Sequence, residues 1–323
     1  MYKKQKLIRD LRPGDAVSDV FVVMNKSAPR AYKNKPGTWF DFNVYDRTGE
    51  ITVKFFGPSD KETTKNLYDS FHAKDVIYIT GNTSEFNGKI EITVNDANGI
   101  RVVPGDEIDP SDFVKKSSRD IAEMEKELLD MIKLVEDPEL AKLLGDIFVN
   151  DGEFRKKFVK IPASMNRHQN WVGGLLEHTL NVAKIVEFVY CIYPGMDRDL
   201  LITGALLHDI GKARELEVGA GISYTVAGEL LGHITIGYDM LQKKMETLKT
   251  PDELRLKLLH ILLSHHGKYE FGSPKLPSIP EAVAINYADD MDAKVADILE
   301  AIKNANTQDA FILHPDFKRI YTK

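Results

Sequence analysis

The sequence predicts a multidomain protein in which an all-β barrel precedes an all-α domain. Residues 39–45, 51–56 and 89–94 alternate apolar and polar side chains, which is typical of half-buried strands. From residue 119 onward, apolar residues instead recur three and four positions apart, as on one face of a helix. Residues 106–118, between these regions, are rich in Pro, Asp, Ser and Lys, which predicts a linker.

Composition restricts the classes to which this protein can belong. The 323 residues are 43% hydrophobic, which is enough for a core in each of two domains. No long apolar stretch follows the charged start or occurs elsewhere, so we expect neither a secretory signal nor a membrane partner. The single Cys191 excludes an intramolecular disulfide and fits a cytoplasmic location. A net charge of -6 means that any nucleic-acid affinity must come from local basic patches.

Residues 1–105 are expected to form a five-stranded barrel. The predicted strands are 15–24, 39–45, 51–56, 76–80 and 89–94. Asp46-Arg-Thr-Gly49 and Asn87-Gly88 predict hairpin turns, and Asn-Gly is the strongest short signal for one. Residues 59–71 have helical spacing and place one helix between the third and fourth strands. Five strands with this single helix are the arrangement of an OB-fold.

The alternation also predicts which barrel side chains face outward. If the inward side chains of residues 40–44 and 51–55 fill the barrel, their neighbours lie on the opposite face. Exposed aromatic rings beside lysines suit stacked bases and phosphates of a single strand. The residues interpreted in this way are Trp39, Tyr45, Lys54 and Phe56, with Lys33 from the basic loop 26–35. Alternatively, the aromatics pack against the second domain and the loop lysines are only solvated.

Residues 119–323 are expected to be helical, with no strand beyond residue 110 and a metal-binding core at about 160–302. The polar loop 162–174 carries Arg167 and His168, which we interpret as substrate-binding residues. A guanidinium can hold a phosphate through two parallel hydrogen bonds. Alternatively, Arg167 forms an ordinary ion pair with one of the chain's many carboxylates.

Histidines and aspartates recur through this helical region, mostly inside apolar segments. His208 and Asp209 are adjacent, and neighbouring helical side chains point about 100° apart. They can therefore serve one centre only near a helix end or by holding one ion from two directions. Asp289 lies on the inward face of a predicted helix, where an unpaired charge costs several kcal/mol. The predicted ligands are His178, His208, Asp209, His233, His265, His266 and Asp289.

This donor set predicts two divalent metal ions. Imidazoles and carboxylates without thiolates suit manganese, iron, cobalt, zinc or nickel rather than a structural zinc site. Seven ligands are too many for one ion, whereas two ions bridged by Asp209 would use them all. We expect His178, His208, Asp209 and Asp289 at the first ion, and Asp209, His233, His265 and His266 at the second.

Such a site fits hydrolysis of phosphodiesters, because paired metals activate water and neutralise charge on phosphoryl oxygens. Asp209 and Lys212 are the predicted catalytic residues, with Lys212 offsetting negative charge on the phosphate or the leaving oxygen. Alternatively, Lys212 is a solvated lysine favoured by the dipole at a helix C-terminus.

The ordered set of His178, His208-Asp209 and Asp289 resembles the HD superfamily of metal-dependent phosphohydrolases. An OB-fold before Gly173-Gly-Leu-Leu-Glu-His178, His208-Asp-Ile-Gly-Lys212 and Ala288-Asp-Asp-Met-Asp292 is similar to the YhaM-type 3′ to 5′ exoribonucleases. This resemblance implies manganese-dependent, sometimes cobalt-dependent, removal of nucleotides from the 3′ end of single-stranded RNA, with single-stranded DNA as a further substrate.

Two alternative functions stay open at this point. One is hydrolysis of free nucleotides or cyclic dinucleotides, and the other is a non-catalytic single-strand-binding protein. After His265-His266 the chain runs Gly-Lys-Tyr-Glu-Phe-Gly and lacks the Gly-Tyr-Pro signature of related cyclic dinucleotide phosphodiesterases, which disfavours a signalling nucleotide. The Leu- and Ile-rich helices could bury surface between subunits, so a homo-oligomer is a further expectation.

Overall fold

The chain forms two compact units in the computed structural model, which describes residues 2–165, 167, 169–305 and 307–323. Residues 1–115 with 218–222 make the first unit, and residues 116–217 with 223–323 make the second. The predicted multidomain class is confirmed, because a β-barrel precedes a helical domain. In the described part of the chain, no helix has both the length and the apolar character needed to cross a membrane.

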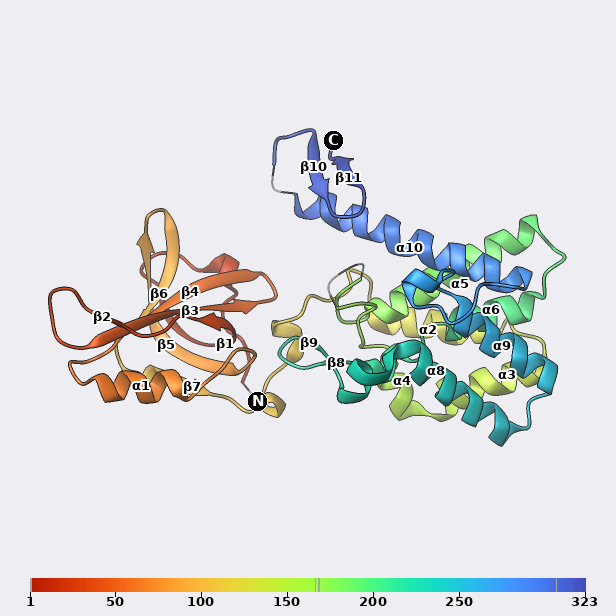
Figure 1. Cartoon of the computed structure of the whole chain (residues 1–323), viewed down its shortest axis with the longest axis horizontal. Helices are drawn as coiled ribbons and strands as arrows, with labels where there is room; N and C mark the ends of the chain where they lie inside the picture. The colour runs from red at the N-terminus through yellow and green to blue at the C-terminus, as the bar shows by residue number, and fades with distance from the viewer. Residues whose placement is uncertain (1, 166, 168, 306) are drawn as a thin grey trace. The chain divides into compact units, whose positions relative to one another are not determined.

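The barrel has the strand order and the inserted helix of an OB-fold (Figure 1). Its long strands are β1 (Ala16–Lys26), β3 (Thr38–Asp46), β4 (Gly49–Phe56), β5 (Val76–Phe86) and β6 (Lys89–Val94). They pair in the order β1-β3-β4-β6-β5, and β5 pairs back with β1 to close the barrel. The helix α1 (Lys61–Asp69) connects β4 to β5, as predicted. Two short strands, β2 (Arg30–Ala31) and β7 (Ile100–Val102), add to β3 and β5.

Local sequence explains the register of the barrel strands. Asn87 and Gly88 both have positive φ, 52° and 76°, and connect β5 to β6 in the predicted tight turn. The inward side chains of residues 40–44 and 51–55 are buried, which confirms the alternation. Their outward neighbours Trp39, Tyr45 and Phe56 are half-buried.

The segment predicted as a linker packs partly on the barrel. Ile108, Phe113 and Val114 are buried, and the first unit extends to residue 115. Two single-turn helices shape this segment, Gly105–Glu107 and Pro110–Asp112. Apolar residues scattered among Pro, Asp and Ser give no periodic signal, so composition alone predicts a linker here.

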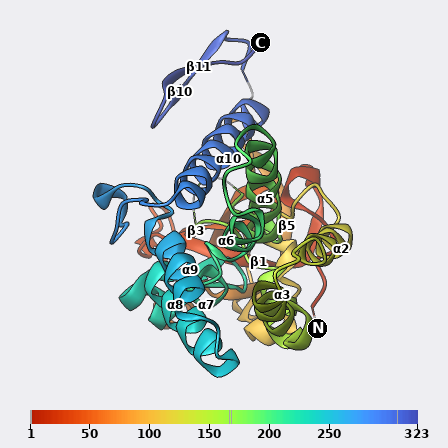
Figure 2. The same cartoon turned by 90° about the vertical axis from the view of Figure 1, so that its right-hand side faces the viewer.

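The second unit is mainly helical, as the apolar spacing predicts. Its helices are α2 (Ile121–Ile132), α3 (Pro138–Leu144) with a π-helical extension (Gly145–Asn150), α4 (Gly152–Phe158), α5 (Gly174–Ile192), α6 (Arg198–Leu207), α7 (Lys212–Glu215), α8 (Val226–Leu248), α9 (Asp252–Ser264) and α10 (Pro280–Asn304). Single-turn 3-10 helices also occur at Ile8–Asp10, Ala97–Gly99 and Tyr269–Phe271. Helix α5 packs beside α6 and α10 (Figure 2).

The expectation that no strand follows residue 110 is wrong. One hairpin pairs β8 (Leu216–Val218) with β9 (Ile222–Tyr224), and another pairs β10 (Phe311–His314) with β11 (Lys318–Tyr321). Strands of three or four residues are too short to show alternation clearly. The second hairpin lies beyond the C-terminal end of α10 (Figure 2).

Candidate metal centre

His208 and Asp209 lie just beyond the end of α6, where the backbone turns. This confirms that the adjacent pair sits at a helix end. His208 Nδ1 donates a hydrogen bond to the Ala205 carbonyl at 2.7 Å, so its Nε2 carries the free lone pair. The ring is therefore fixed in the tautomer that a metal ligand requires.

His265 and His266 follow the last residue of α9 and are held in the same way. His265 Nδ1 donates to the Leu262 carbonyl at 2.7 Å, and His266 Nδ1 donates to the Phe271 carbonyl at 2.8 Å. Backbone carbonyls thus fix both rings with Nε2 as the available donor atom for a metal.

His233 lies directly after a break in α8. Gly232 has φ 70° and ψ 156°, a conformation that favours glycine, and helical geometry resumes beyond it. The freed backbone N–H of His233 donates to Glu215 Oε1 at 2.8 Å, and its ring Nδ1 donates to the same oxygen at 3.2 Å. Gly211 allows the His208-Asp209 turn to come close, because a Cβ there would lie 1.9 Å from the His233 carbonyl oxygen.

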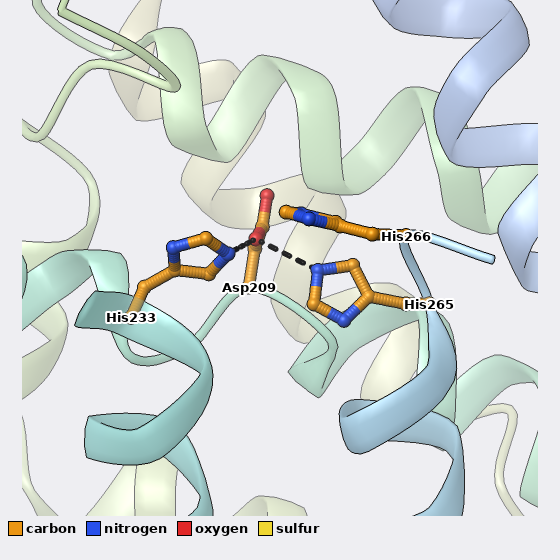
Figure 3. A group of neighbouring side chains, drawn as sticks. All are labelled: Asp209, His233, His265 and His266. Carbon is orange, nitrogen blue, oxygen red and sulfur yellow. Dashed lines mark ion pairs between the residues drawn. The ribbon is translucent and has the colours of Figure 1, made fainter. Parts of the chain in front are cut away.

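Asp209 faces a different group of imidazoles with each of its carboxylate oxygens. Its Oδ1 lies 3.5 Å from both His233 Nε2 and His265 Nε2 (Figure 3). Its Oδ2 lies 3.4 Å from His208 Nε2 and 3.6 Å from His178 Nε2. A single buried carboxylate therefore joins two clusters of nitrogen donors.

The structure brings all seven predicted ligands together. Two sets of donor atoms each lie within 4.8 Å of one another, and Asp209 belongs to both. The first set is His178, His208 and Asp209, and the second is Asp209, His233, His265 and His266. Asp289 joins the first set, since its Oδ1 lies 3.1 Å from His178 Nε2.

Three buried atoms in this centre have no hydrogen-bond partner among the described residues: Asp209 Oδ1, His233 Nε2 and His265 Nε2. Burying an acceptor without a partner costs about 1–3 kcal/mol, and a cation would offset that cost. Oxygen and imidazole nitrogen donors suit divalent transition metals. The residues present therefore fit divalent metal ions.

The two carboxylates of the centre are held ionised. Burial raises the pKa of Asp209, but the charges of Lys212 and His208 outweigh burial and hold the pKa well below its usual range. Burial likewise raises the pKa of Asp289, and the hydrogen bond and charge of His178 reverse this effect and lower it. Both side chains therefore supply negative charge at neutral pH.

The imidazoles differ in their protonation. Burial lowers the pKa of His265, and burial is also the largest cause that lowers the pKa of His266, to about 4. These rings are neutral at physiological pH, as metal ligands must be. Burial also acts to lower the pKa of His178, but hydrogen bonds to Asp289 and Asp292 raise it to about 9. A metal ion bound by His178 would therefore have to displace the proton from its Nε2.

Further side chains orient the ligands. The position of Asp292, one turn beyond Asp289, predicts that it orients an imidazole of this centre, and its Oδ2 accepts a 2.7 Å hydrogen bond from His178 Nδ1. Asp292 also accepts from Gln169 Nε2 at 2.9 Å and Asn181 Nδ2 at 3.0 Å. Sequence reasoning missed Gln169, Asn181 and Glu215, because nothing in their local sequence distinguishes them from solvated polar residues.

Lys212 begins α7, and its side chain is mostly buried. Its ammonium lies 2.7 Å from Asp209 Oδ2, so the alternative of a solvated lysine at a helix end is wrong. Arg167 forms an ion pair with Asp316. Such a pair with a carboxylate is the alternative that the sequence offers to substrate binding by Arg167. Substrate binding by Arg167 stays a prediction, and His168 lies outside the described residues.

The outward barrel face carries a row of aromatic rings. Phe56 stacks between Trp39, at a centroid distance of 6.1 Å, and Tyr32, at 6.5 Å. The guanidinium of Arg30 lies 4.3 Å from the centroid of the Trp39 ring. Arg30 lies in the loop 26–35 that was predicted to be basic, whereas Tyr32 in the same loop was not predicted, because no alternation marks it.

The other predicted barrel residues have different surroundings. Lys54 forms a 2.6 Å ion pair with Glu91 and lies over the Phe86 ring. Tyr45 packs against a second apolar cluster of the first unit, and its hydroxyl donates to the Ala220 carbonyl at 3.4 Å. Lys33 is exposed. Binding of nucleic acid by these residues stays a prediction.

Comparisons with known proteins match the two units separately. Residues 175–301 match the family described as HD domain, and residues 22–100 match the family described as OB-fold nucleic acid binding domain. The chain thus carries an OB-fold domain followed by an HD domain. HD domains bind divalent metals, and an HD domain indicates a metal-dependent phosphohydrolase.

Similar solved structures include a chain of a replication protein A heterotrimer bound to single-stranded DNA, at 17% identity, over 30% of this chain and 64% of that chain, with a TM-score of 0.21. An OB domain from Thermoplasma acidophilum matches at 18% identity, over 35% of this chain and 90% of that chain, with a TM-score of 0.23. Asparaginyl-tRNA synthetase from Pyrococcus horikoshii matches at 13% identity, over 45% of this chain and 36% of that chain, with a TM-score of 0.25. This chain spans less than two thirds of the replication protein A chain that it matches.

Proposed function

We propose that this protein is a metal-dependent exonuclease that removes nucleotides from the 3′ end of single-stranded RNA and releases 5′-mononucleotides. Single-stranded DNA is a second proposed substrate. The observation that carries the proposal is the position of Asp209, whose two oxygens face two separate groups of imidazoles. Phosphodiester hydrolysis is a reaction that two neighbouring metals catalyse well. The direction of digestion and the preference for RNA follow from the resemblance to YhaM-type exoribonucleases.

The centre has ligands for two ions. His178, His208, Asp209 and Asp289 would hold one, and Asp209, His233, His265 and His266 would hold the other. Manganese is the expected metal, with cobalt or iron as alternatives. When bound, such ions supply a nucleophile from water at neutral pH and neutralise charge on the phosphoryl oxygens.

The protein's own side chains contribute positioning and charge. Asp292 and Glu215 hold the rings of His178 and His233 by hydrogen bonds to Nδ1. The ammonium of Lys212, beside Asp209, is placed to offset negative charge on the scissile phosphate. Arg167 and His168 are the proposed contacts to the substrate phosphate. The guanidinium of Arg167 has five N–H donors, so it can contact the phosphate while its Nη1 stays paired with Asp316.

The barrel would hold the single strand while the helical unit cleaves it. Trp39 and Phe56, with Tyr32 in the same stack, offer ring faces for bases. Lys33 and Lys54 are the proposed contacts to phosphates, and Tyr45, at the other end of β3, is a further proposed ring for a base.

The test uses a 5′-labelled single-stranded oligonucleotide and a series of divalent metals. We expect a descending ladder of products with manganese, because removal from the 3′ end shortens the labelled strand stepwise. Intact substrate with every metal in the series would contradict the proposal. Faster hydrolysis of free nucleotides or cyclic dinucleotides than of the oligonucleotide would instead assign the alternative phosphohydrolase function.

A further inference from the structure

The C-terminal hairpin carries an exposed face of aromatic, aliphatic and basic side chains. Phe311 pairs with Tyr321 and Leu313 with Arg319, and directly opposite residues of an antiparallel pair share one face. Phe311, Leu313 and Tyr321 are 45%, 85% and 57% exposed, and Arg319 is also exposed. The Phe311 and Tyr321 rings lie 5.4 Å apart, and the Arg319 guanidinium lies 4.7 Å from the Phe311 centroid.

The opposite face of the hairpin is anchored to the helical unit. Ile320 and His314 on this face are buried. The backbone N–H groups of Asp316 and Phe317 donate to His314 Nδ1, so its Nε2 carries the proton and donates to Asp297 on α10 at 3.3 Å. The hairpin thus has a defined inner face, and its outer face is available to a ligand.

Two connections place the hairpin near the metal centre. Asp297 follows the ligand Asp289 by eight residues on α10, which corresponds to about 12 Å along the helix. Asp316, in the hairpin turn, pairs with Arg167 in the loop 162–173. The same loop carries Gln169, which donates to Asp292 beside His178. The helix and the loop that border the metal centre therefore both hold the hairpin.

The charge of this segment favours an anionic ligand. Lys318, Arg319 and Lys323 are exposed cations. Of the two carboxylates in residues 307–323, Asp316 is paired with Arg167 and Asp309 is exposed, so the cations outnumber the carboxylates. Aromatic rings flanked by Arg and Lys are the combination that binds bases and phosphates of single strands. A purely apolar protein contact would not need these cations.

We propose that Phe311, Leu313, Arg319 and Tyr321 form a second binding platform for single-stranded nucleic acid, separate from the barrel. Bases stack on Phe311 and Tyr321, and Arg319 contacts a phosphate. The platform holds the strand beside the metal centre during successive cleavages. This inference rests on the proposed nuclease function and assigns it a second contact with its substrate.

The first test is kinetic and uses the full-length chain with Phe311→Ala and Tyr321→Ala combined. We expect the KM for a single-stranded oligonucleotide to rise about tenfold, with kcat within about twofold, because only uniform substrate binding is lost. Hydrolysis of bis(p-nitrophenyl) phosphate should not change, since this small diester needs only the metal centre. The matched control combines Phe188→Ala and Tyr193→Ala, which remove exposed rings of similar exposure, 67% and 64%, at the far end of α5. The control should leave the KM unchanged.

The second test does not depend on turnover. An oligonucleotide containing 5-iodouridine is irradiated with the protein in chelator, and the cross-linked peptides are identified by mass spectrometry. Cross-links at Phe311 or Tyr321 support the platform, even if no oligonucleotide is cleaved and the proposed nuclease function fails. An unchanged KM with no cross-link in residues 307–323 would overturn the inference. Analytical sedimentation tests whether the hairpin face instead binds a second copy of this chain. If the parent protein is a dimer and the Phe311→Ala, Tyr321→Ala variant is a monomer with unchanged oligonucleotide affinity, the inference is overturned.

Discussion

The barrel and the helical unit build their candidate sites in opposite ways. The barrel's outward rings come from neighbouring strands, and each ring is partly exposed. The helical unit instead gathers ligands from residue 178 to residue 289 around one carboxylate that is 2% exposed. The barrel rings are half-buried, whereas most donors of the metal centre are buried and lie against one another. The two regions should therefore respond differently to the same kind of substitution.

The largest effect should come from Asp209→Asn, which keeps the shape of the side chain but removes the shared charge. We expect kcat for an oligonucleotide to fall by at least about a thousandfold, because both groups of ligands lose their common member. Oligonucleotide affinity, measured by fluorescence anisotropy, should change less than about threefold, because Trp39 and Phe56 are untouched.

The matched control is Asp290→Asn, because Asp290 pairs with Lys294 outside the ligand set. It should retain activity. A parallel loss of affinity and turnover in Asp209→Asn would mean that the strand binds mainly at the metal centre, and the contrast between the two regions would not hold.

The next effect tests the barrel. Trp39→Ala combined with Phe56→Ala should weaken oligonucleotide binding by about tenfold to a hundredfold, because stacking contributes roughly 1–3 kcal/mol per base. Metal content and hydrolysis of bis(p-nitrophenyl) phosphate should stay as in the parent protein. Val102→Ala, which removes an exposed apolar residue from β7, is the control. Unchanged binding in the double variant would remove the barrel rings from the substrate path.

The smallest effect should come from Glu215→Gln, which compares the two groups of ligands within the metal centre. Glu215→Gln can still accept hydrogen bonds from His233 but lacks the negative charge. We expect metal affinity at the His233 group to fall about tenfold and affinity at the His178 group to stay the same, as measured by calorimetric titration. Glu217→Gln, two residues further on and exposed, is the control. Equal loss at both groups would show that Glu215 supports the general fold rather than His233.

Much of the fold could be predicted because its signals are local and long enough to repeat. Strands such as β3 and β4 span eight or more residues, so alternation identifies their inward faces. Hairpin strands β8 and β10 have three and four residues, too few for a period to show. The same limit hid Tyr32, which directly follows the two-residue strand β2.

The candidate metal ligands could be proposed from the sequence because few side chains can ligate a transition metal, and these lie in apolar segments where they need a partner. Two of the residues that hold these groups in place could not be predicted. Glu215 acts on His233, 18 residues away, and Gln169 acts on Asp292, 123 residues away. A polar side chain acquires such a role only from the partner that folding places beside it.

The sequence by itself determined the order of a barrel before a helical domain, the inward faces of the long strands and the identity of the donor atoms. These properties depend on side-chain chemistry and on periods of two or about 3.6 residues, which any single segment displays. The tertiary structure alone decided that Asp209 faces both groups of imidazoles, that Glu215 fixes His233 and that the C-terminal hairpin is attached beside the centre. Distances between segments far apart in the chain depend on how whole helices pack, and no local pattern encodes them.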